Sequence, residues 1–335
     1  MSTAWIRTHQ LGQLSEKHTN ETVTVMGWVH NRRDHGDVVF IDLRDRNGLS
    51  QVVLDPAVSK EAHSIGEQCR HEYVLAVTGK VRRRPQGMEN SNLPSGQIEV
   101  EVHHAEILNE SETPPFQIQD NVEANENLRL KYRYLDLRRS TLKDNIVKRA
   151  SIARAFRKHL EEELFLEIET PYLYKSTPEG AREFLVPSRL HAGSFYSLPQ
   201  SPQVFKQVLM VSGFDRYYQV VKCFRDEDLR SDRQPEFTQI DCELSFINQE
   251  QILAIMESIV KKVVADTCQK KLPDFINMDY QTAMDTYGCD KPDLRFELFL
   301  ENITSLVEKC DFKVFSTAIS MGGIINAVVV RDGAN

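Results

Sequence analysis

Residues 220–246, VVKCFRDEDLRSDRQPEFTQIDCELSF, decide how this chain folds. The apolar run at 218–221 and the alternating run at 237–246 flank a charged loop, and this arrangement predicts a β-hairpin. Polar side chains of both signs also occupy strand positions, where they are costly unless they pair or meet a ligand. They are Lys222, Arg225, Glu227, Gln239, Asp241 and Glu243. The hairpin is therefore either a lattice of structural ion pairs or a ligand site.

The sequence of this stretch resembles motif 2 of class II aminoacyl-tRNA synthetases, in the form found in aspartyl-tRNA synthetases. The resemblance is carried by Phe-Arg-Asp-Glu at 224–227, a long loop, and Pro-Glu-Phe-Thr-Gln-Ile-Asp at 235–241. It implies two steps: aspartate attacks the α-phosphate of ATP to give aspartyl-adenylate, and the 3′-terminal hydroxyl of a tRNA then takes the aspartyl group. The first step needs no general base, because the attacking carboxylate is already ionised at neutral pH.

The resemblance assigns ATP to residues of the hairpin and its loop. It makes Arg225 the catalytic residue, since a guanidinium can clamp the α-phosphate bidentately as negative charge gathers there. Glu227 would accept from the adenine amino group, and Phe237 would stack on the adenine ring. The implied ATP-binding set is Arg225, Asp226, Glu227, Gln234 and Phe237. Mg²⁺ accompanies ATP and neutralises its phosphates, and no metal ligand is implied within this chain.

A second group of residues is implied to hold the aspartate. Gln203 and Lys206 lie three residues apart on a predicted helix, and QSPQVFKQ at 200–207 resembles the aspartate-recognition segment of the family. A lysine that meets the side-chain carboxylate explains a preference for aspartate over neutral asparagine. Glu179 belongs to a predicted loop at 176–182 that resembles the one closing over the amino acid. The implied aspartate-binding set is Glu179, Ser201, Gln203, Lys206, Arg225, Gln239 and Asp241.

Two members of this set also have a purely structural interpretation. Ser201 precedes Pro202, and a serine followed by a proline is typical of the N-terminal cap of a helix. Glu179 fits equally well as a solvated side chain of an exposed loop. The residue types alone therefore leave the role of both residues open, and only the family resemblance favours substrate binding.

Length and composition limit the classes of protein to which this chain can belong. The chain has 335 residues, enough for two domains, with 41% hydrophobic and 27% charged residues. No apolar run approaches the roughly 20 residues of a membrane span, and no signal-like stretch begins the chain, so we expect a cytoplasmic protein without membrane contact. The six cysteines include no CxxC pair, which favours buried free thiols over a zinc site or a disulfide framework.

Residues 1–112 predict an all-β domain. Alternating apolar runs indicate strands at 23–29, 38–44, 49–54, 73–81 and 97–103, with one helix at 56–69. Five strands with a helix between the third and the fourth match the plan of the OB-fold, whose barrel binds oligonucleotides. Although the net charge of the chain is −8, this part is locally basic, and a local basic patch is the electrostatic footprint of nucleic-acid binding.

Three residues of this domain are candidates for binding bases. Arg33, Phe40 and Gln51 are expected near the face of the second and third strands, where a ring can stack on an unpaired base and Arg and Gln can read its edges. The alternative for Phe40 is a place in the barrel core. GWVHNRRDHG at 27–36 and FIDLRDRNG at 40–48 resemble the anticodon-binding domain of aspartyl-tRNA synthetases. The resemblance implies that Arg33, Phe40 and Gln51 meet the anticodon of tRNA(Asp).

His35 and Gly87 lie where family members with different tRNA specificity differ. A histidine and a glycine at these positions resemble the non-discriminating form, which charges tRNA(Asn) as well as tRNA(Asp). Physically, a small residue leaves room at the third anticodon base, and a histidine can bond to either pyrimidine. The alternative is that both are ordinary turn residues.

The fold class expected for the whole chain is α+β, with the OB-fold barrel followed by a class II synthetase catalytic domain built on an antiparallel sheet. The Pro-containing, acidic segment opening 113–141 predicts a linker or hinge, and 142–311 is expected to be the catalytic domain. Its predicted helix at 142–165 and the short strand before Pro171 resemble motif 1, which implies a homodimer. Residues 312–335 resemble the start of an insertion domain of bacterial members.

Two features expected from the resemblance have no match in this sequence. The glycine-rich motif 3 and the substrate-binding histidine have no counterpart, which predicts an incomplete catalytic domain. A tRNA-binding protein without the activation step is therefore an alternative function. Two others are a synthetase for asparagine or lysine, against which Lys206 argues, and an asparagine synthetase, which would lack the N-terminal barrel.

Overall fold

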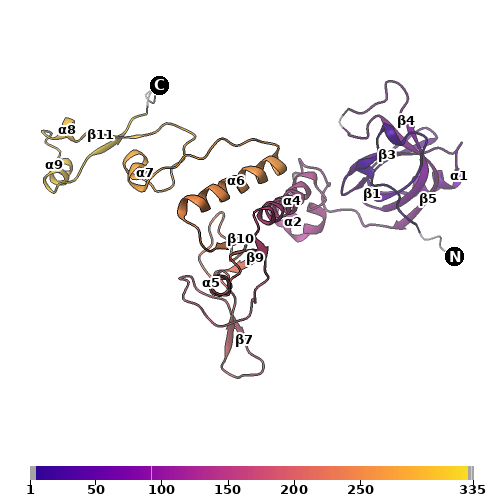
Figure 1. Ribbon diagram of the computed structural model, residues 1–335. Coiled ribbons are helices and arrows are strands. Elements are labelled where there is room, and N and C mark those ends of the chain that lie inside the picture. Colours follow the sequence, from indigo (N-terminus) through magenta and orange to yellow (C-terminus); the bar gives the residue numbers. More distant parts are fainter. Residues whose placement is uncertain (1–4, 92, 331–332, 334–335) are drawn as a thin grey trace. The chain divides into compact units, whose positions relative to one another are not determined.

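The computed structural model describes residues 5–91, 93–330 and 333 and divides into two compact units, Met1–Lys158 and His159–Asn335 (Figure 1). The predicted insertion segment at 312–335 includes positions 331, 332, 334 and 335, which lie outside the described residues. No helix among the described residues is both long and apolar enough to cross a membrane.

The first unit contains a closed five-stranded barrel (Figure 1). Its strands are β1 Thr22–His35, β2 Val38–Asp45, β3 Gly48–Leu54, β4 Val74–Arg83 and β5 Ile98–Asn109. They pair in the order β1-β2-β3-β5-β4, and β1 closes the ring by pairing with β4. Helix α1, Lys60–Gln68, lies between β3 and β4 in the chain. The predicted OB-fold is therefore confirmed, with β1 and β5 longer than expected.

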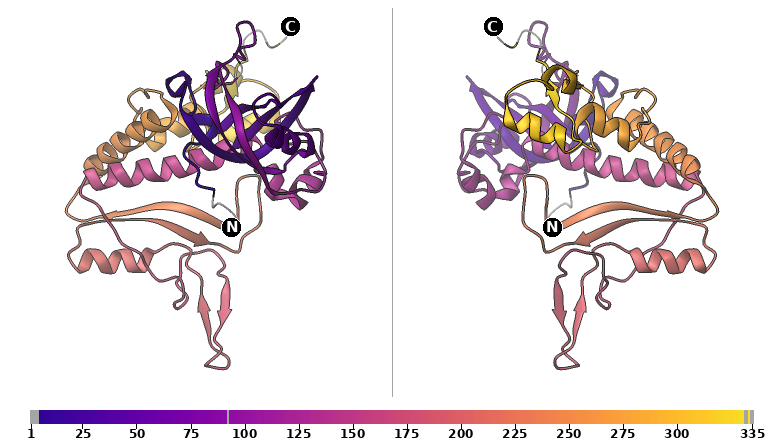
Figure 2. Two further views of the ribbon diagram at one scale, coloured as in Figure 1. Left: turned by 90° about the vertical axis from the view of Figure 1, so that its right-hand side faces the viewer. Right: turned by 90° about the vertical axis from the view of Figure 1, so that its left-hand side faces the viewer.

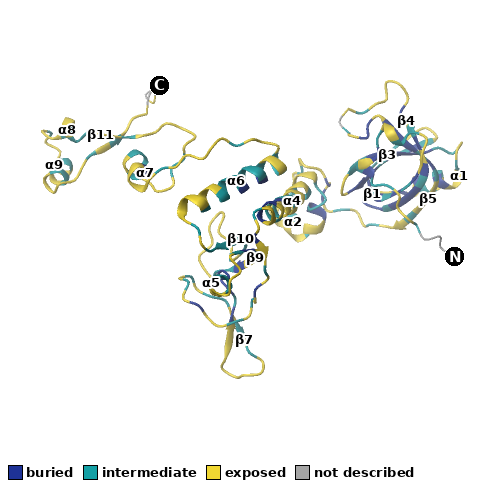
Figure 3. Cartoon of the chain, in the orientation of Figure 1, coloured by how far each residue is buried: buried dark blue, intermediate teal, exposed yellow. Residues whose placement is uncertain are grey.

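The barrel forms because the apolar side chains of its strands alternate inward. Val25, Ile41 and Leu75 are completely buried, and the strands of the barrel are the most continuously buried part of the chain (Figure 3). Gly27 shows how closely the strands approach, because a Cβ there would lie 2.3 Å from the carbonyl oxygen of Arg44. The short helices η1 Leu11–Gln13 and η2 Glu16–His18 precede the barrel, and Leu11 belongs to its core.

A buried ion cluster joins the barrel to the chain that follows it. The Arg44 guanidinium contacts both oxygens of the Glu72 carboxylate at 2.8 and 2.7 Å, and Arg138 reaches the same carboxylate at 2.6 Å. The Arg138 guanidinium also lies 4.7 Å from the centre of the Trp28 ring. Burial lowers the pKa of Arg44 in spite of its contact with Glu72. Glu72 is therefore the shared anion of two cations.

The segment predicted as a hinge contains regular structure of its own. Helices α2 Glu126–Lys131 and α3 Arg133–Asp136 lie within it, and Asn125 caps α2 by accepting from the backbone of Leu128. A small apolar cluster forms around Phe116, Ile118 and Leu135. Helix α4, Ser140–Glu162, follows and continues into the second unit.

The second unit is built on a three-stranded mixed sheet in the order β10-β9-β6. The strands are β6 Leu166–Glu167, β9 Arg216–Phe224 and β10 Glu236–Leu244; β6 runs parallel to β9, and β9 and β10 form the predicted antiparallel hairpin. Helix α5, Gln203–Val211, lies along this hairpin (Figure 2). A second hairpin projects from the unit and consists of β7 Leu185–Pro187 and β8 Phe195–Ser197 (Figure 1).

The rest of the second unit is helix α6 and a more exposed segment (Figure 3). Helix α6, Gln249–Cys268, begins with a capping box in which Asn248 and Gln251 bond reciprocally. The later elements are α7 Tyr280–Tyr287, β11 Leu300–Asn302, α8 Thr304–Val307, α9 Lys313–Ser320 and β12 Asn326–Val328. Asp279 caps helix α7 by accepting from the backbone of Thr282.

Helix α4 is less buried than its apolar spacing suggested. Leu160 is buried, but Ile146 is 53% exposed, and Leu164, beyond the end of the helix, is 81% exposed with a positive φ of 64°. Periodicity correctly predicted the helix, whereas burial depends on neighbours that periodicity does not report.

We expect Glu72→Gln to lower the free energy of unfolding of the barrel by about 3 kcal/mol, because the neutral amide leaves the buried Arg44 cation without its counter-charge. Both tryptophans of the chain, Trp5 and Trp28, belong to this unit, so tryptophan fluorescence during denaturation reports barrel unfolding. Glu16→Gln is the control, since the pair of Glu16 with Arg83 is exposed. Equal stability of the two variants would contradict the assignment.

Candidate functional site

The register of the β9–β10 hairpin places the candidate residues on one face. Phe237 faces Cys223, Gln239 faces Val221 and Asp241 faces Gln219. Since alternate residues of a strand point to the same side, the three β10 side chains share a face. Lys222 pairs with Glu236 at 2.6 Å on the opposite face, where both side chains are about half exposed. The Lys222–Glu236 ion pair is thus kept apart from the face that carries the candidate residues.

Helix α5 places the ammonium group of Lys206 on this face of the hairpin. The Lys206 Nζ atom lies 2.9 Å from Asp241 Oδ1 and 3.4 Å from Glu243 Oε2. Burial works to lower the pKa of Lys206, but its contacts with the two carboxylates outweigh burial and raise it. For Asp241 the balance is different: burial raises the pKa of its carboxyl group, and the contact with Lys206 opposes this change without cancelling it. The pair is therefore mostly buried and held by direct hydrogen bonding.

The loop at 176–182 is fixed against the start of α5. The Ser201 hydroxyl donates to Glu179 Oε2 at 2.7 Å, and the Thr177 hydroxyl donates to Glu179 Oε1 at 3.0 Å. Ser201 therefore does not cap the helix: the cap position is Pro202, with no side-chain hydrogen bond, so the structural interpretation of Ser201 as an N-cap is wrong. Both oxygens of Glu179 accept hydrogen bonds, which contradicts the alternative of a freely solvated side chain.

Gln200 is a further residue of this loop contact that the sequence did not single out. Its side chain is 1% exposed, accepts from the backbone N–H of Ala181 at 3.0 Å and donates to the Ala181 carbonyl at 2.9 Å. These two reciprocal bonds from one amide fix the loop at Ala181 to the segment that leads into α5. Only its neighbourhood to Ser201 and Gln203 in the sequence could have drawn attention to it.

Two polar atoms on this side of the hairpin are buried without a hydrogen-bond partner among the described residues. They are the Nε atom of Arg225, a donor, and the Oδ2 atom of Asp241, an acceptor. The Arg225 guanidinium lies over the Phe237 ring, 5.1 Å from its centre. An unsatisfied buried polar atom costs about 1–3 kcal/mol, which a ligand that bonds to it can recover. One donor and one acceptor are thus available to a ligand.

Four charged candidate residues influence the pKa of the buried Cys223 thiol. Its pKa is raised to about 11, first by burial and then by Asp241 and Glu179, while Arg225 and Lys206 act in the opposite direction. Charges from the loop at 176–182, helix α5, strand β10 and the first residue after β9 therefore all act on this one buried side chain. Gln239 joins them because its amide oxygen accepts from the Cys223 thiol at 3.2 Å.

The other candidates for ATP lie in the loop between the strands and are exposed. Glu227 is 3.8 Å from Arg233, and the backbone N–H of Asp226 donates to the carbonyl of Arg182. Gln234 is exposed and Gln203 is half buried at the first residue of α5. The structure thus gathers Arg225, Phe237 and the aspartate candidates other than Gln203. No hydrogen bond or ion pair among the described residues joins Gln203, Asp226, Glu227 or Gln234 to this cluster.

Beneath the hairpin lies a buried polar network that sequence reasoning missed. The Gln219 amide oxygen accepts from the hydroxyls of Tyr217 and Thr170, each at 2.9 Å. Gln219 faces Asp241 across the two strands. This network fixes the side of β9 on which the candidate site is built, and a glutamine within an apolar strand was the available signal.

On the barrel, the three predicted base-binding residues belong to one network. The Arg33 guanidinium bonds both oxygens of Asp42 at 2.7 and 2.9 Å and donates to the Gln51 amide oxygen at 3.0 Å. Phe40 faces Arg33 in the register of β1 and β2 and is half buried, so the alternative of a core position is wrong. The Gln51 amide in turn donates to Glu99 at 2.8 Å. Asp42 and Glu99 were not predicted.

The two candidate discrimination residues are both exposed. The His35 ring packs edge-on against Phe40, with ring centres 5.8 Å apart. Gly87 has a positive φ of 85°, and a Cβ there would meet nothing within 4 Å. Arg84, just before this turn, is buried, and its terminal NH2 atom has no partner among the described residues. Burial lowers the pKa of Arg84, so an anionic or acceptor ligand would relieve a real cost.

Comparison with known proteins identifies the family. Residues 125–315 match the family described as tRNA synthetases class II (D, K and N), and residues 23–108 match the OB-fold nucleic acid binding domain. The first match covers more than half of the chain. The chain belongs to the class II tRNA synthetases of the D, K and N group.

Curated relatives agree with this family. An aspartate–tRNA(Asp/Asn) ligase of Desulfatibacillum aliphaticivorans is 54% identical over 330 residues, which are 98% of this chain and 55% of that protein. An aspartate–tRNA ligase of Staphylococcus epidermidis is 53% identical over 98% of this chain and 56% of its own length. The chain therefore spans about half the length of the curated relatives it matches.

Solved structures share the fold at low sequence identity. The aspartyl-tRNA synthetase of Entamoeba histolytica superimposes with a TM-score of 0.65 at 22% identity, covering 81% of this chain and 57% of that one. The asparaginyl-tRNA synthetase of Pyrococcus horikoshii, complexed with asparaginyl-adenylate, gives a TM-score of 0.66 at 23% identity, with 77% and 57% covered. These likenesses support the architecture of a barrel followed by a class II catalytic domain.

We expect Lys206→Met to lower the free energy of unfolding of the second unit by about 3 kcal/mol, because it leaves the buried Asp241 carboxylate without its cation. Lys222→Met is the matched control and should cost at most about 1 kcal/mol, since its ion pair is exposed. Burial favours neutral Asp241, so the deficit of Lys206→Met should shrink as pH falls through the raised pKa of that carboxyl. Thermal unfolding followed by circular dichroism at two pH values tests both statements.

The thiols of the hairpin should be unreactive at pH 8. The pKa of Cys223 is raised to about 11 and that of Cys242 to about 12, mainly by burial, so roughly one thiol in a thousand or fewer is ionised. Since the thiolate is the nucleophile, alkylation by iodoacetamide should be roughly 100-fold slower than for free cysteine. Mass spectrometry of tryptic peptides, with exposed Cys289 as the internal control, measures this ratio. Equal labelling of all three would show that the hairpin opens.

Proposed function

We propose that this chain is part of an aspartate–tRNA ligase, which activates L-aspartate with ATP and transfers it to tRNA(Asp) and tRNA(Asn). The observation that carries the proposal is the pair of unsatisfied buried atoms, Arg225 Nε and Asp241 Oδ2, within one cluster that also contains Lys206 and Glu179. A donor for a phosphate and an acceptor for an ammonium are what the two substrates of the activation step require. The names of the relatives supply the choice of aspartate.

In the activation step, the hairpin would act by position and charge. The aspartate α-carboxylate attacks the α-phosphorus of ATP, a P–O bond forms to it, and the bond to the pyrophosphate oxygen breaks. Negative charge grows on the non-bridging α-phosphate oxygens, and Arg225 is placed to donate to them. Phe237, stacked beneath the Arg225 guanidinium, offers its ring to adenine. Mg²⁺ enters with ATP as part of the nucleotide substrate.

Aspartate itself would be held at both ends. Asp241 Oδ2 and the Gln239 amide accept from the α-ammonium group, with Glu179 adding negative charge from the loop. Lys206 addresses the side-chain carboxylate. Lys206 presently bonds Asp241 and Glu243, so substrate binding requires it to share its three donors with a third anion. Neutral asparagine offers no such anion, and the ammonium therefore favours aspartate.

The barrel would select the tRNA. Phe40 supplies a half-exposed ring, and the Arg33 and Gln51 side chains are pre-oriented by Asp42 and Glu99. The open space at Gly87 and the exposed ring of His35 support acceptance of either tRNA at the third anticodon base. We assign residues 1–112 to anticodon binding, 113–141 to the connection and 142–311 to activation, with 312–335 opening an insertion domain. We further propose a cytoplasmic homodimer.

The activation step is tested by aspartate-dependent ATP–pyrophosphate exchange with this chain. Arg225→Ala should lower exchange by roughly 100-fold or more, as expected when a group that stabilises transition-state charge is lost. Arg233→Ala, in the same loop but outside the buried cluster, is the control and should retain exchange. Exchange that survives Arg225→Ala would refute the assigned role. No exchange by the unaltered chain, with tRNA binding retained, would instead favour the tRNA-binding function alone.

Binding of tRNA tests the barrel separately. Phe40→Ala should weaken binding of a tRNA(Asp) transcript by roughly 5- to 150-fold, since stacking on one aromatic side chain contributes about 1–3 kcal/mol. A transcript with an exchanged anticodon is the control and should bind weakly to both proteins. A tRNA(Asn) transcript should bind as well as tRNA(Asp), and its rejection would refute the proposed relaxed specificity.

A further inference from the structure

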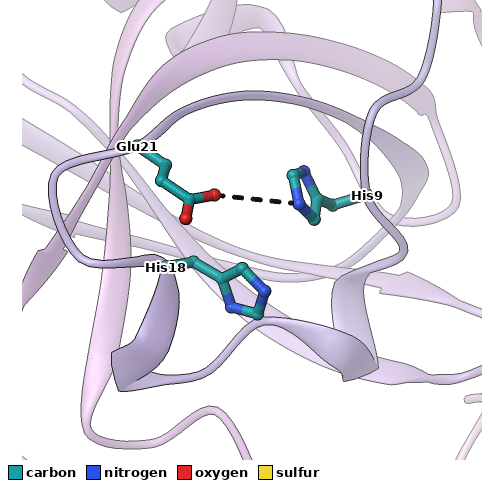
Figure 4. A group of neighbouring side chains, drawn as sticks. All are labelled: His9, His18 and Glu21. Carbon is teal, nitrogen blue, oxygen red and sulfur yellow. Dashed lines mark ion pairs between the residues drawn. The ribbon is translucent and has the colours of Figure 1, made fainter.

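A cluster of three potential metal ligands lies in the first unit, apart from every residue assigned above. His9, His18 and Glu21 each offer one ligand atom, and these atoms all lie within 4.8 Å of one another. Figure 4 shows the Glu21 carboxylate facing the His9 ring, with the His18 ring below them. The His9 Nε2 atom is 3.9 Å from Glu21 Oε2, and the centres of the two rings are 5.1 Å apart.

Backbone hydrogen bonds anchor the segments that carry the three residues to the barrel. The backbone N–H of Glu21 donates to the His18 carbonyl at 2.9 Å, and the Glu21 carbonyl accepts from Val81 of β4 at 2.9 Å. On the other side, Thr8 exchanges hydrogen bonds with Thr24 of β1. The segment that carries His9 and the turn that carries His18 and Glu21 are thus both anchored to the barrel.

The hydrogen bonds of Thr8 determine which nitrogen of His9 is free. The Thr8 hydroxyl donates to the Thr24 carbonyl at 3.2 Å and accepts from the Thr24 N–H at 2.8 Å. With the hydroxyl hydrogen directed at the Thr24 carbonyl, the Thr8 oxygen is an acceptor at its 3.0 Å contact with His9 Nδ1, which favours the tautomer whose Nδ1–H donates to it. In the neutral ring, Nε2 then carries a lone pair directed at the Glu21 carboxylate. Two acceptors 3.9 Å apart, His9 Nε2 and Glu21 Oε2, then face each other, and a cation bound between them would satisfy both.

His18 is placed to add the third ligand. Its Nδ1 atom lies 3.1 Å from the backbone nitrogen of Ser15, 3.3 Å from the Ser15 carbonyl oxygen and 3.4 Å from the Ser15 hydroxyl. Nδ1 can therefore either accept from the N–H or donate to the carbonyl. The second arrangement frees Nε2 as a ligand, and a second-shell carbonyl that accepts from the other nitrogen is the usual partner of a metal-bound histidine.

We propose that His9, His18 and Glu21 form a binding site for a divalent transition-metal ion of the Zn²⁺ type. Two imidazole nitrogens and a carboxylate oxygen suit Zn²⁺, while Mg²⁺ and Ca²⁺ prefer all-oxygen sites. Water completes the coordination, since Glu21 is half exposed. The ligands come from three points of the segment that leads into β1. The ion therefore fastens that segment to the barrel and takes no part in the aminoacylation chemistry.

Titration of the intact 335-residue chain with ZnCl₂ in an isothermal calorimeter tests the site. We expect one ion per chain, and a roughly 10- to 100-fold loss of affinity in His9→Gln and in Glu21→Gln. His63→Gln is the matched control, because His63 also lies 4.0 Å from a glutamate, Glu67, but belongs to no three-ligand group among the described residues. Its affinity should equal that of the unaltered chain. Because the substituted side chains are partly exposed, thermal unfolding without metal should be nearly unchanged in every variant.

A second measurement reports the ligand atoms directly. In ¹⁵N spectra of the histidine rings, added Zn²⁺ should shift the Nε2 resonances of His9 and His18 and leave those of His63 unmoved. Binding that survives the double change of His9 and His18 to glutamine, or shifts confined to other histidines, would overturn the proposal. Equal binding of Mg²⁺ and Zn²⁺ would overturn the assigned class of ion. Both outcomes are independent of aminoacylation activity.

Discussion

The pairing register of β9 and β10 is the constraint on which the candidate active site depends. A shift by one residue would turn Asp241, Gln239 and Phe237 to the opposite face of the hairpin. The β10 side chains that now share the face of Lys222 would take their place. Two contacts on opposite faces, Lys206 with Asp241 and Lys222 with Glu236, favour the observed alignment. The two ion pairs therefore stabilise the same register that places the candidate residues on one face.

The two proposed sites use the same physical device. In both, a guanidinium or ammonium is pre-oriented by a buried carboxylate: Lys206 by Asp241 in the second unit, and Arg33 by Asp42 in the barrel. Such a pair costs little conformational entropy when a ligand arrives, because the cation is already ordered. Atoms left without a partner, at Arg225, Asp241 and Arg84, then indicate where ligand atoms are needed.

The sequence predicted those parts that depend on alternation and local chemistry. The five barrel strands follow from inward-facing apolar residues, and the hairpin follows from two alternating runs around a charged loop. Partners distant in sequence were not predictable. The Ser201 hydroxyl looks like a helix cap until Glu179, 22 positions earlier, is brought to it by the fold. Likewise, nothing near Gln51 in the sequence indicates Glu99 as its partner.

The position of β10 in its sheet has a consequence for association. In the order β10-β9-β6, and among the described residues, β10 is an edge strand whose outer backbone groups have no neighbouring strand. An open edge is a template for pairing with another chain. The β-barrel of the first unit, being closed, presents no such row. Strand addition at the β10 edge would bring two copies of the same strand together, and the carboxylates of Asp241 and Glu243 counteract it by repelling their counterparts in the second copy.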